Sequence, residues 1–285
     1  MKPKVYIWLN CVVLLVAASL FLFRDLNDAA MLIKRSMYYI LPLVVIVALV
    51  HLLKGFRLYF LLSGEKITLV EFAKQYCKTV PISVIIPFKL GEIFKVYCYG
   101  YSIRNYPMAI VYILIDRFFD TLALLSIITL ATQFTNGNFT WVFYLLFLFG
   151  LLIFAIYLVL PSICMYWIKY LLQARASRSN LRILSIISAV KNICNAVSTA
   201  VKGKGIIVFS LSVISWIVEI GGLALLSNID GNASSAVTMI TNYLGAALGI
   251  GHSSSLNYFV VMTIVMLIIC YAVLHFVNKR QRGHV

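Results

Sequence analysis

The chain has 285 residues, of which 62% are hydrophobic and only 12% are charged, with a formal net charge of +15. This composition excludes an ordinary soluble domain. It predicts an all-α membrane protein, because several stretches approach or exceed the roughly 20 apolar residues that one bilayer crossing needs. Alternating segments of about 10 residues, the mark of a transmembrane β-barrel, are absent.

Six apolar segments predict transmembrane helices. They are residues 5–23, 37–53, 106–132, 139–160, 206–227 and 257–277. The first follows Lys2 and Lys4 as a signal peptide would, but it is longer than a signal core and has no clear cleavage site. We therefore expect a retained first span, and one integral membrane domain over residues 1–285.

The segment between the second and third spans is apolar but interrupted. Its core, residues 80–97, is interrupted by two prolines, one glycine and three charged residues. They are Pro81, Pro87, Gly91, Lys89, Glu92 and Lys95. Broken backbone at membrane depth is tolerated only where protein or a watery cavity surrounds it. We expect a re-entrant element made of two short helices that meet near Pro87–Gly91. The glycine-rich stretch 244–252 is a candidate for a second such element, or for a helix-packing patch.

Basic residues are concentrated in one connection and in the tail. The 133–140 loop has no charge, whereas residues 161–204 carry seven cations: Lys169, Arg175, Arg178, Arg182, Lys191, Lys202 and Lys204. This asymmetry predicts cytoplasmic N- and C-termini and a cytoplasmic loop at 161–204. Arg24, Lys34 and Arg35 in the first outside loop conflict with it. Because the basic residues are split among loops, nucleic acid is not an expected partner.

A helical pattern runs through the second half of that basic loop. Apolar residues recur at spacings of three and four over 180–201 and form one stripe. The stripe suits a helix at the cytoplasmic membrane interface. A solvated connector that packs on neighbouring loops is the alternative.

Charged residues within apolar segments form the candidate functional site, since ionisable groups at membrane depth are costly. Asp116 and Asp120 are four residues apart, so they share one helix face and need a cation, a shared proton or water between them. Arg117 points about 100° away from Asp116 and is expected to serve both acids poorly. The expected partners are cations brought in by folding: Lys89, Lys95 and Arg57.

Two further residues extend the site, each with alternatives. Gly91 follows a proline-broken backbone, so exposed amides near Lys89 and Lys95 could hold a phosphate, or the segment is a simple kink. Glu219 is a lone acid in a span, and it either pairs with a basic group of the first half or snorkels near an interface. The whole set is either functional or a buried ion-pair network that only holds the re-entrant element in place.

No catalytic residue, metal site or cofactor is predicted. The chain contains no GxSxG, HExxH or phosphate-binding glycine loop, and its six cysteines and four histidines are dispersed. We therefore do not expect an enzyme. An intramembrane enzyme is an alternative without a recognisable nucleophile or metal set.

Three motifs in order carry a resemblance to a known family. They are Leu-Leu-Lys-Gly-Phe-Arg at 52–57, Ile-Pro-Phe-Lys-Leu-Gly-Glu-Ile-Phe-Lys at 86–95 and Asp-Arg-Phe-Phe-Asp at 116–120. Together they resemble the transmembrane region of the lysylphosphatidylglycerol synthase/flippase family, whose members also often place a Trp and an acid where Trp216 and Glu219 stand. The family's second Pro-Gly-Gly-x-Gly element corresponds to 244–252, which lacks the proline and the following acid. No aminoacyl-transferase domain follows, so lysyl transfer is not expected.

The resemblance implies the lipid-handling half of that family. It implies a flippase-like protein of a prokaryotic plasma membrane that moves an anionic or aminoacylated phospholipid, or a polyprenyl-phosphate-linked lipid, between leaflets. The expected substrate-binding residues are Arg57, Lys89, Gly91, Glu92, Lys95, Asp116, Arg117, Asp120 and Glu219. The alternative is a non-transporting membrane partner of a cell-envelope glycosyltransferase, docked through the basic residues of 169–204. Homo-oligomerisation is left open.

Overall fold

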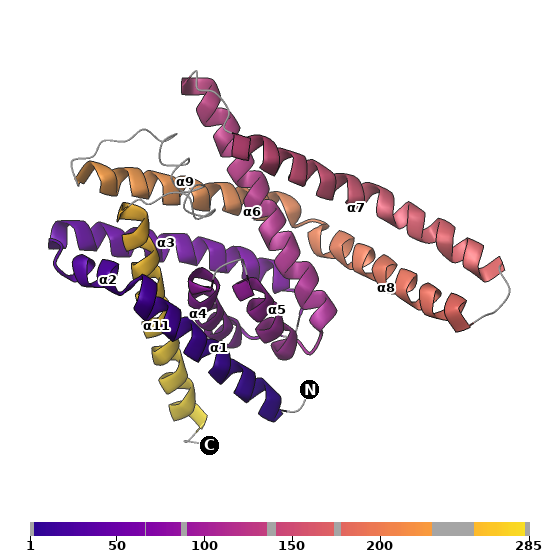
Figure 1. Cartoon of the computed structure of the whole chain (residues 1–285), viewed down its shortest axis with the longest axis horizontal. Coiled ribbons are helices and arrows are strands. Elements are labelled where there is room, and N and C mark those ends of the chain that lie inside the picture. Colours follow the sequence, from indigo (N-terminus) through magenta and orange to yellow (C-terminus); the bar gives the residue numbers. More distant parts are fainter. Residues whose placement is uncertain are drawn as a thin grey trace.

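The structure is a computed structural model that describes residues 3–65, 67–86, 90–135, 141–173, 178–229 and 254–282. Every regular element in these ranges is a helix (Figure 1). In chain order they are α1 (Pro3–Arg24), α2 (Leu26–Ile33), α3 (Met37–Leu62), α4 (Leu69–Ile85), α5 (Leu90–Ser102), α6 (Tyr106–Thr135), α7 (Trp141–Gln173), α8 (Arg178–Val201), α9 (Gly205–Ile229) and α11 (Ser254–Arg282). The predicted all-α class is confirmed.

Six helical segments of the described chain are long and apolar enough to cross a membrane. They are Val5–Phe23, Met37–Leu62, Gly150–Gln173, Arg182–Val201, Gly205–Ile229 and Leu256–Val277. Most of them match predicted spans. The exception is Arg182–Val201, in the connection where we expected no span. The predicted span 106–132 lies within α6, which has 30 residues and carries three charges in its first half. The chain is therefore a multi-pass helical membrane protein.

The expected end of the fourth span at residue 160 is wrong. Helix α7 continues through Pro161 to Gln173, a length of 33 residues or about 50 Å. Proline is tolerated inside membrane helices where neighbours or local adjustments satisfy the freed backbone groups. The predicted basic loop 161–204 is consequently mostly helix: the end of α7, then α8, which packs against α7 and α6. The helix expected over 180–201 is confirmed as α8, and its interfacial position stays a prediction.

Helices α4 and α5 form a helical hairpin, here called the α4–α5 hairpin. They have 17 and 13 residues, about 26 and 20 Å, and both are shorter than the roughly 30 Å hydrocarbon core. They pack against each other on either side of residues 86–89. The two predicted short helices are thus present. Pro81 does not interrupt the first of them, because α4 continues through it to Ile85.

Gly91 is required by the packing of the hairpin. A Cβ placed on it would lie 2.2 Å from the Ser83 Cα of α4, which is main chain and cannot move aside cheaply. Gly91 is buried and lies within α5 without a positive φ. Of the two roles that glycine suggested, close approach is the one observed.

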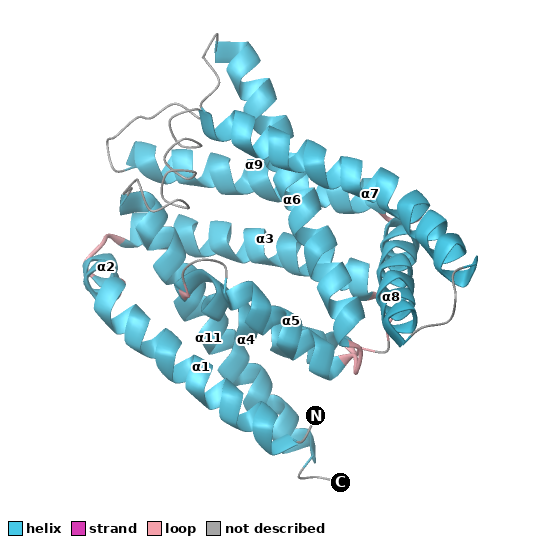
Figure 2. Ribbon diagram, turned by 45° about the vertical axis from the view of Figure 1, so that its right-hand side comes forward, coloured by secondary structure: helices cyan, strands magenta, loops and turns pink. Residues whose placement is uncertain are grey.

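Helix α3 lies in the middle of the bundle. It packs chiefly on α9 and also contacts α4, α6 and α11. Figures 1 and 2 show α9 along one side of α3 and the α4–α5 hairpin along the other. The described start of α1 and end of α11 lie on the same side of the bundle (Figures 1 and 2). The cytoplasmic orientation of both termini stays a prediction.

Candidate functional site

Arg57, in the interior of α3, is the centre of the site. Its Nε donates to Asp116 Oδ1 at 2.8 Å, and its Nη1 donates to Asp120 Oδ1 at 2.6 Å and to Ser212 Oγ at 2.9 Å. The side chains of Arg57 and Asp116 are each 1% exposed. One guanidinium therefore joins α3 to both carboxylates of α6 and to α9, as expected for a cation brought in by folding.

Arg117 also serves both aspartates, which corrects the expectation that it is poorly placed. Its Nη2 donates to Asp116 Oδ2 at 2.9 Å, and its Nη1 lies 3.7 Å from Asp120 Oδ2 and 3.7 Å from Glu92 Oε1. The expectation considered only the direction of the Cα–Cβ bond. A long side chain that ends in a planar fork of donors can reach back across its own helix.

The α4–α5 hairpin joins the site through α5. Lys95 Nζ lies 3.9 Å from Asp116 Oδ2 and 3.9 Å from Glu92 Oε2. These are ion pairs at the outer limit of distance and not hydrogen bonds. Glu92 Oε2 is buried and has no hydrogen-bond partner among the described residues. Lys95 is thus one of the cations that neutralise Asp116, as the sequence predicts.

Glu219 pairs with a basic group of the first half, and the snorkelling alternative is wrong. Its Oε2 lies 2.5 Å from Lys54 Nζ, and its side chain is 1% exposed. The Lys54 ammonium also lies 5.3 Å from the centre of the Trp216 ring. Sequence reasoning did not include Lys54 in the site. The available signal was its spacing of three residues from Arg57, which puts both on one face of α3.

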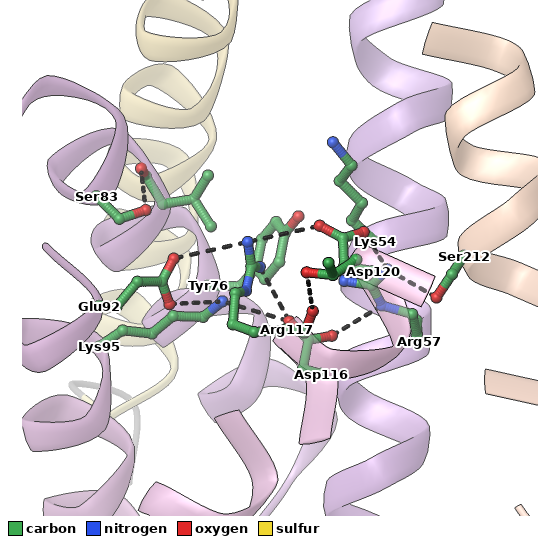
Figure 3. A network of polar contacts seen from close by, with 12 residues as sticks. Lys54, Arg57, Tyr76, Ser83, Glu92, Lys95, Asp116, Arg117, Asp120 and Ser212 are labelled. Carbon is green, nitrogen blue, oxygen red and sulfur yellow. Dashed lines mark hydrogen bonds and ion pairs between the residues drawn. The ribbon is translucent and has the colours of Figure 1, made fainter. Parts of the chain in front are cut away.

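We call this set the ionic network, and Figure 3 shows most of it, from Glu92 and Lys95 on one side to Ser212 on the other. Its described cations and carboxylates are equal in number: Lys54, Arg57, Lys95 and Arg117 against Glu92, Asp116, Asp120 and Glu219. Their formal charges cancel. Predicted site residue Lys89 and the glycine-rich stretch 244–252 lie outside the described residues.

Access to the ionic network is uneven. Arg117 is 40% exposed and Glu92 21%, whereas Arg57 and Lys95 are 1% and 3% exposed and already face carboxylates. Among the described cations of the ionic network, Arg117 is therefore the best placed to meet an external anion. No group of three or more His, Cys, Asp or Glu within the described ranges is arranged to hold a metal ion.

A second polar chain, absent from the sequence prediction, runs beside the network. His51 Nδ1 lies 3.2 Å from Tyr76 Oη on α4, and His51 Nε2 lies 3.1 Å from Thr263 Oγ1 on α11. All three side chains are buried. His51 is one turn before Lys54 on α3, and Figure 3 draws Tyr76 together with residues of the ionic network. The sequence suggested no role for His51, because its two partners, Tyr76 and Thr263, are distant from it in sequence.

Comparisons with known proteins agree with this architecture. No curated protein and no solved structure matches the chain. One family model does, that of the lysylphosphatidylglycerol synthase transmembrane region, over residues 7–273. The match begins within α1 and ends within α11, so it includes the α4–α5 hairpin and the whole ionic network. The chain therefore belongs to the lysylphosphatidylglycerol synthase transmembrane region family, a lipid-related membrane domain.

Proposed function

We propose that the chain is a flippase-like transporter of a prokaryotic plasma membrane. Its substrate is a lipid with a phosphate-bearing headgroup: an anionic or aminoacylated phospholipid, or a polyprenyl-phosphate-linked lipid. The observation that supports this proposal is the ionic network, which is buried at Arg57 and accessible at Arg117 and Glu92.

The physical problem of lipid movement is the charged headgroup. It must cross about 30 Å of hydrocarbon, where unpaired charges are costly. Short, discontinuous helices beside buried charges are a recurrent way to build a binding site at membrane depth. The α4–α5 hairpin, with Glu92 and Lys95 on α5, has this form.

Each part of the network then has a role. The Arg117 guanidinium binds the phosphate, because its donors match phosphate oxygens. Glu92 holds Arg117 or an ammonium group of the headgroup. Arg57 and Lys95 keep the aspartates neutralised while Arg117 is engaged by the lipid.

The test is a leaflet-resolved assay in proteoliposomes. Dithionite added outside the vesicles bleaches fluorescent phosphatidylglycerol in the outer leaflet. The fraction of the label that becomes bleached over time reports movement of the lipid between leaflets. The wild type is expected to move the lipid, Glu92→Gln to lose most of this activity, and Glu71→Gln, an exposed acid on α4, to retain it. If the headgroup distribution between the two leaflets is the same with the wild type and with Glu92→Gln, the proposal is contradicted.

The balance of charges favours a second candidate. A network in which the formal charges of the described cations and carboxylates cancel can be purely structural. In this second candidate function, the chain is a non-transporting membrane partner of a cell-envelope glycosyltransferase. The basic residues of 169–204 dock the enzyme in this case. Copurification of a glycosyltransferase that is lost when Arg175, Arg178 and Arg182 are neutralised, together with no lipid movement, favours this candidate over transport.

A further inference from the structure

We propose that Lys78 on α4 forms a second anion site, which binds the phosphate of an anionic membrane lipid at the seam between α1 and the α4–α5 hairpin. Helix α1 packs on α4 along this seam (Figures 1 and 2). The site shares no residue with the ionic network, so it stands independently of the proposed transport function. It assigns a ligand to a cation that the headgroup site does not use.

The positive charge of Lys78 is held in place but not neutralised. Its ammonium donates to one amide oxygen, Asn10 Oδ1, and lies 5.1 Å and 5.5 Å from the ring centres of Tyr6 and Phe94. None of the carboxylates in the described part of the chain forms an ion pair with Lys78. By contrast, each of the four described cations of the ionic network has a carboxylate within 3.9 Å. Aromatic rings and an amide attract a cation without cancelling its charge, so a net positive charge remains at the seam.

The Lys78 ammonium can reach an external anion. An ammonium has three donors, and among the described residues only Asn10 accepts a hydrogen bond from this one. The side chain is half-buried, and its four-carbon stem is flexible. Its remaining donors can therefore meet the oxygens of a phosphate while the contact to Asn10 is kept.

The position of the seam favours a lipid as the source of that anion. Asn10 lies within the apolar segment Val5–Phe23, about 8 Å from its start. The Tyr6 ring stacks there on the rings of Tyr101 and Tyr97 of α5, with centroids 3.9 Å and 5.5 Å apart, and clustered tyrosines are typical of the membrane–water interface. At this level an unneutralised charge is costly, and the nearest anions are lipid phosphates. Because the site has a net positive charge, it should prefer phosphatidylglycerol to the zwitterionic phosphatidylcholine.

The alternative role for Lys78 is to fasten α1 to the hairpin, and Asn10 separates the two roles. Asn10 is 8% exposed, and its Nδ2 donates to the Tyr6 carbonyl at 2.6 Å, which leaves Oδ1 facing Lys78. Asn10→Asp gives up the bond to the carbonyl but places a carboxylate of nearly the same shape against the ammonium. A fastening contact is then kept, whereas an anion site loses its charge.

The test locates bound lipid by photo-crosslinking. The full chain is held in nanodiscs of phosphatidylcholine with a small fraction of phosphatidylglycerol that carries a diazirine near the headgroup. Peptide mass mapping then measures the label at α1 and the hairpin, and competition by unlabelled phosphatidylglycerol gives the affinity. Wild type is expected to be labelled at the seam. Lys78→Met and Asn10→Asp should each weaken the affinity there about tenfold, and Lys169→Met, an exposed lysine on α7, should leave it unchanged.

Three results overturn the inference: no label at the seam in the wild type, equal competition by phosphatidylcholine, or unchanged affinity in Asn10→Asp. If Lys78→Met does not fold, Asn10→Asp decides the question, with Lys78→Arg expected to keep the label because it keeps the charge. Inorganic phosphate that binds to the wild type in pure phosphatidylcholine nanodiscs, and not to Asn10→Asp, assigns the site to a free anion and overturns the lipid assignment.

The result is separable from that of the transport assay. Arg117→Gln alters the ionic network and is expected to leave the label at the seam unchanged. Loss of that label in Arg117→Gln assigns the lipid to the headgroup site of the network and overturns a second site. A labelled seam in a protein that moves no lipid contradicts transport and leaves the second site standing.

Discussion

Arg57 and Asp116 are 59 residues apart in sequence and form an ion pair in which both side chains are 1% exposed, with Nε 2.8 Å from Oδ1. The pair joins α3 to α6 at the middle of the bundle. Removing Arg57 leaves the buried carboxylates of Asp116 and Asp120 without their closest cation, and such a loss is costly. The hydrogen bond from Arg57 to Ser212 is lost at the same time.

Arg57→Met is therefore expected to be strongly destabilising. The free energy of unfolding in detergent, measured by denaturant titration, should fall by about 3–5 kcal/mol, because two carboxylates lose their closest cation. The matched control is Arg182→Met on α8, where the arginine is exposed and the expected change is within about 0.5 kcal/mol. Similar stabilities for the two variants would show that the network contributes little to folding.

Lys54 and Glu219 are expected to be energetically coupled. Lys54→Met leaves the Glu219 carboxylate buried and unpaired, whereas Lys54→Met/Glu219→Leu removes both charges. The double variant should be more stable than the sum of the two single changes predicts, by about 0.5–3 kcal/mol. A double-mutant cycle on the free energy of unfolding measures this term, and strict additivity contradicts a direct pair.

The fold could be predicted from sequence where one local signal decided the structure. Long apolar runs located the spans, and prolines beside charges located the break between α4 and α5. Pro81 was expected to interrupt its segment, and Pro161 directly follows the expected end of the fourth span, yet both lie within helices. Whether a membrane helix passes a proline depends on what satisfies the freed backbone groups, and that information lies in the tertiary structure.

Most members of the ionic network were predictable from the sequence, but part of their pairing was not. Unusual charges in apolar segments identified Asp116, Asp120 and Glu92, because burial of a charge is costly wherever it occurs. The reach of Arg117 and the Lys54–Glu219 pair depend on the positions of side chains across helices. Spacing along α3 places Lys54 on the same face as Arg57, but it does not identify the partner of Lys54 on α9.

Gly91→Ala should destabilise the α4–α5 hairpin. The new methyl group would lie 2.2 Å from the Ser83 Cα, so the two helices must separate, at an expected cost of about 1–3 kcal/mol. Gly221→Ala on α9 is the matched control. It has no neighbour within 4 Å, and the same substitution should stabilise that helix by about 0.5–1 kcal/mol. If both substitutions change the free energy of unfolding in the same direction relative to the wild type, this packing is contradicted.

Arg117→Gln is expected to separate lipid binding from stability. Its guanidinium is 40% exposed, and Arg57 and Lys95 still face Asp116 in the variant, so the free energy of unfolding should fall by about 1 kcal/mol or less. Loss of a charged hydrogen-bond donor to phosphate should weaken binding of short-chain phosphatidylglycerol by about 10- to 100-fold. Arg117→Lys keeps the charge without the fork of donors, so its affinity for the lipid should lie between those of the wild type and Arg117→Gln. Isothermal titration in nanodiscs gives the affinities, with Arg182→Gln as the control. If Arg117→Gln binds the lipid as tightly as the wild type, the headgroup does not meet the network at this arginine.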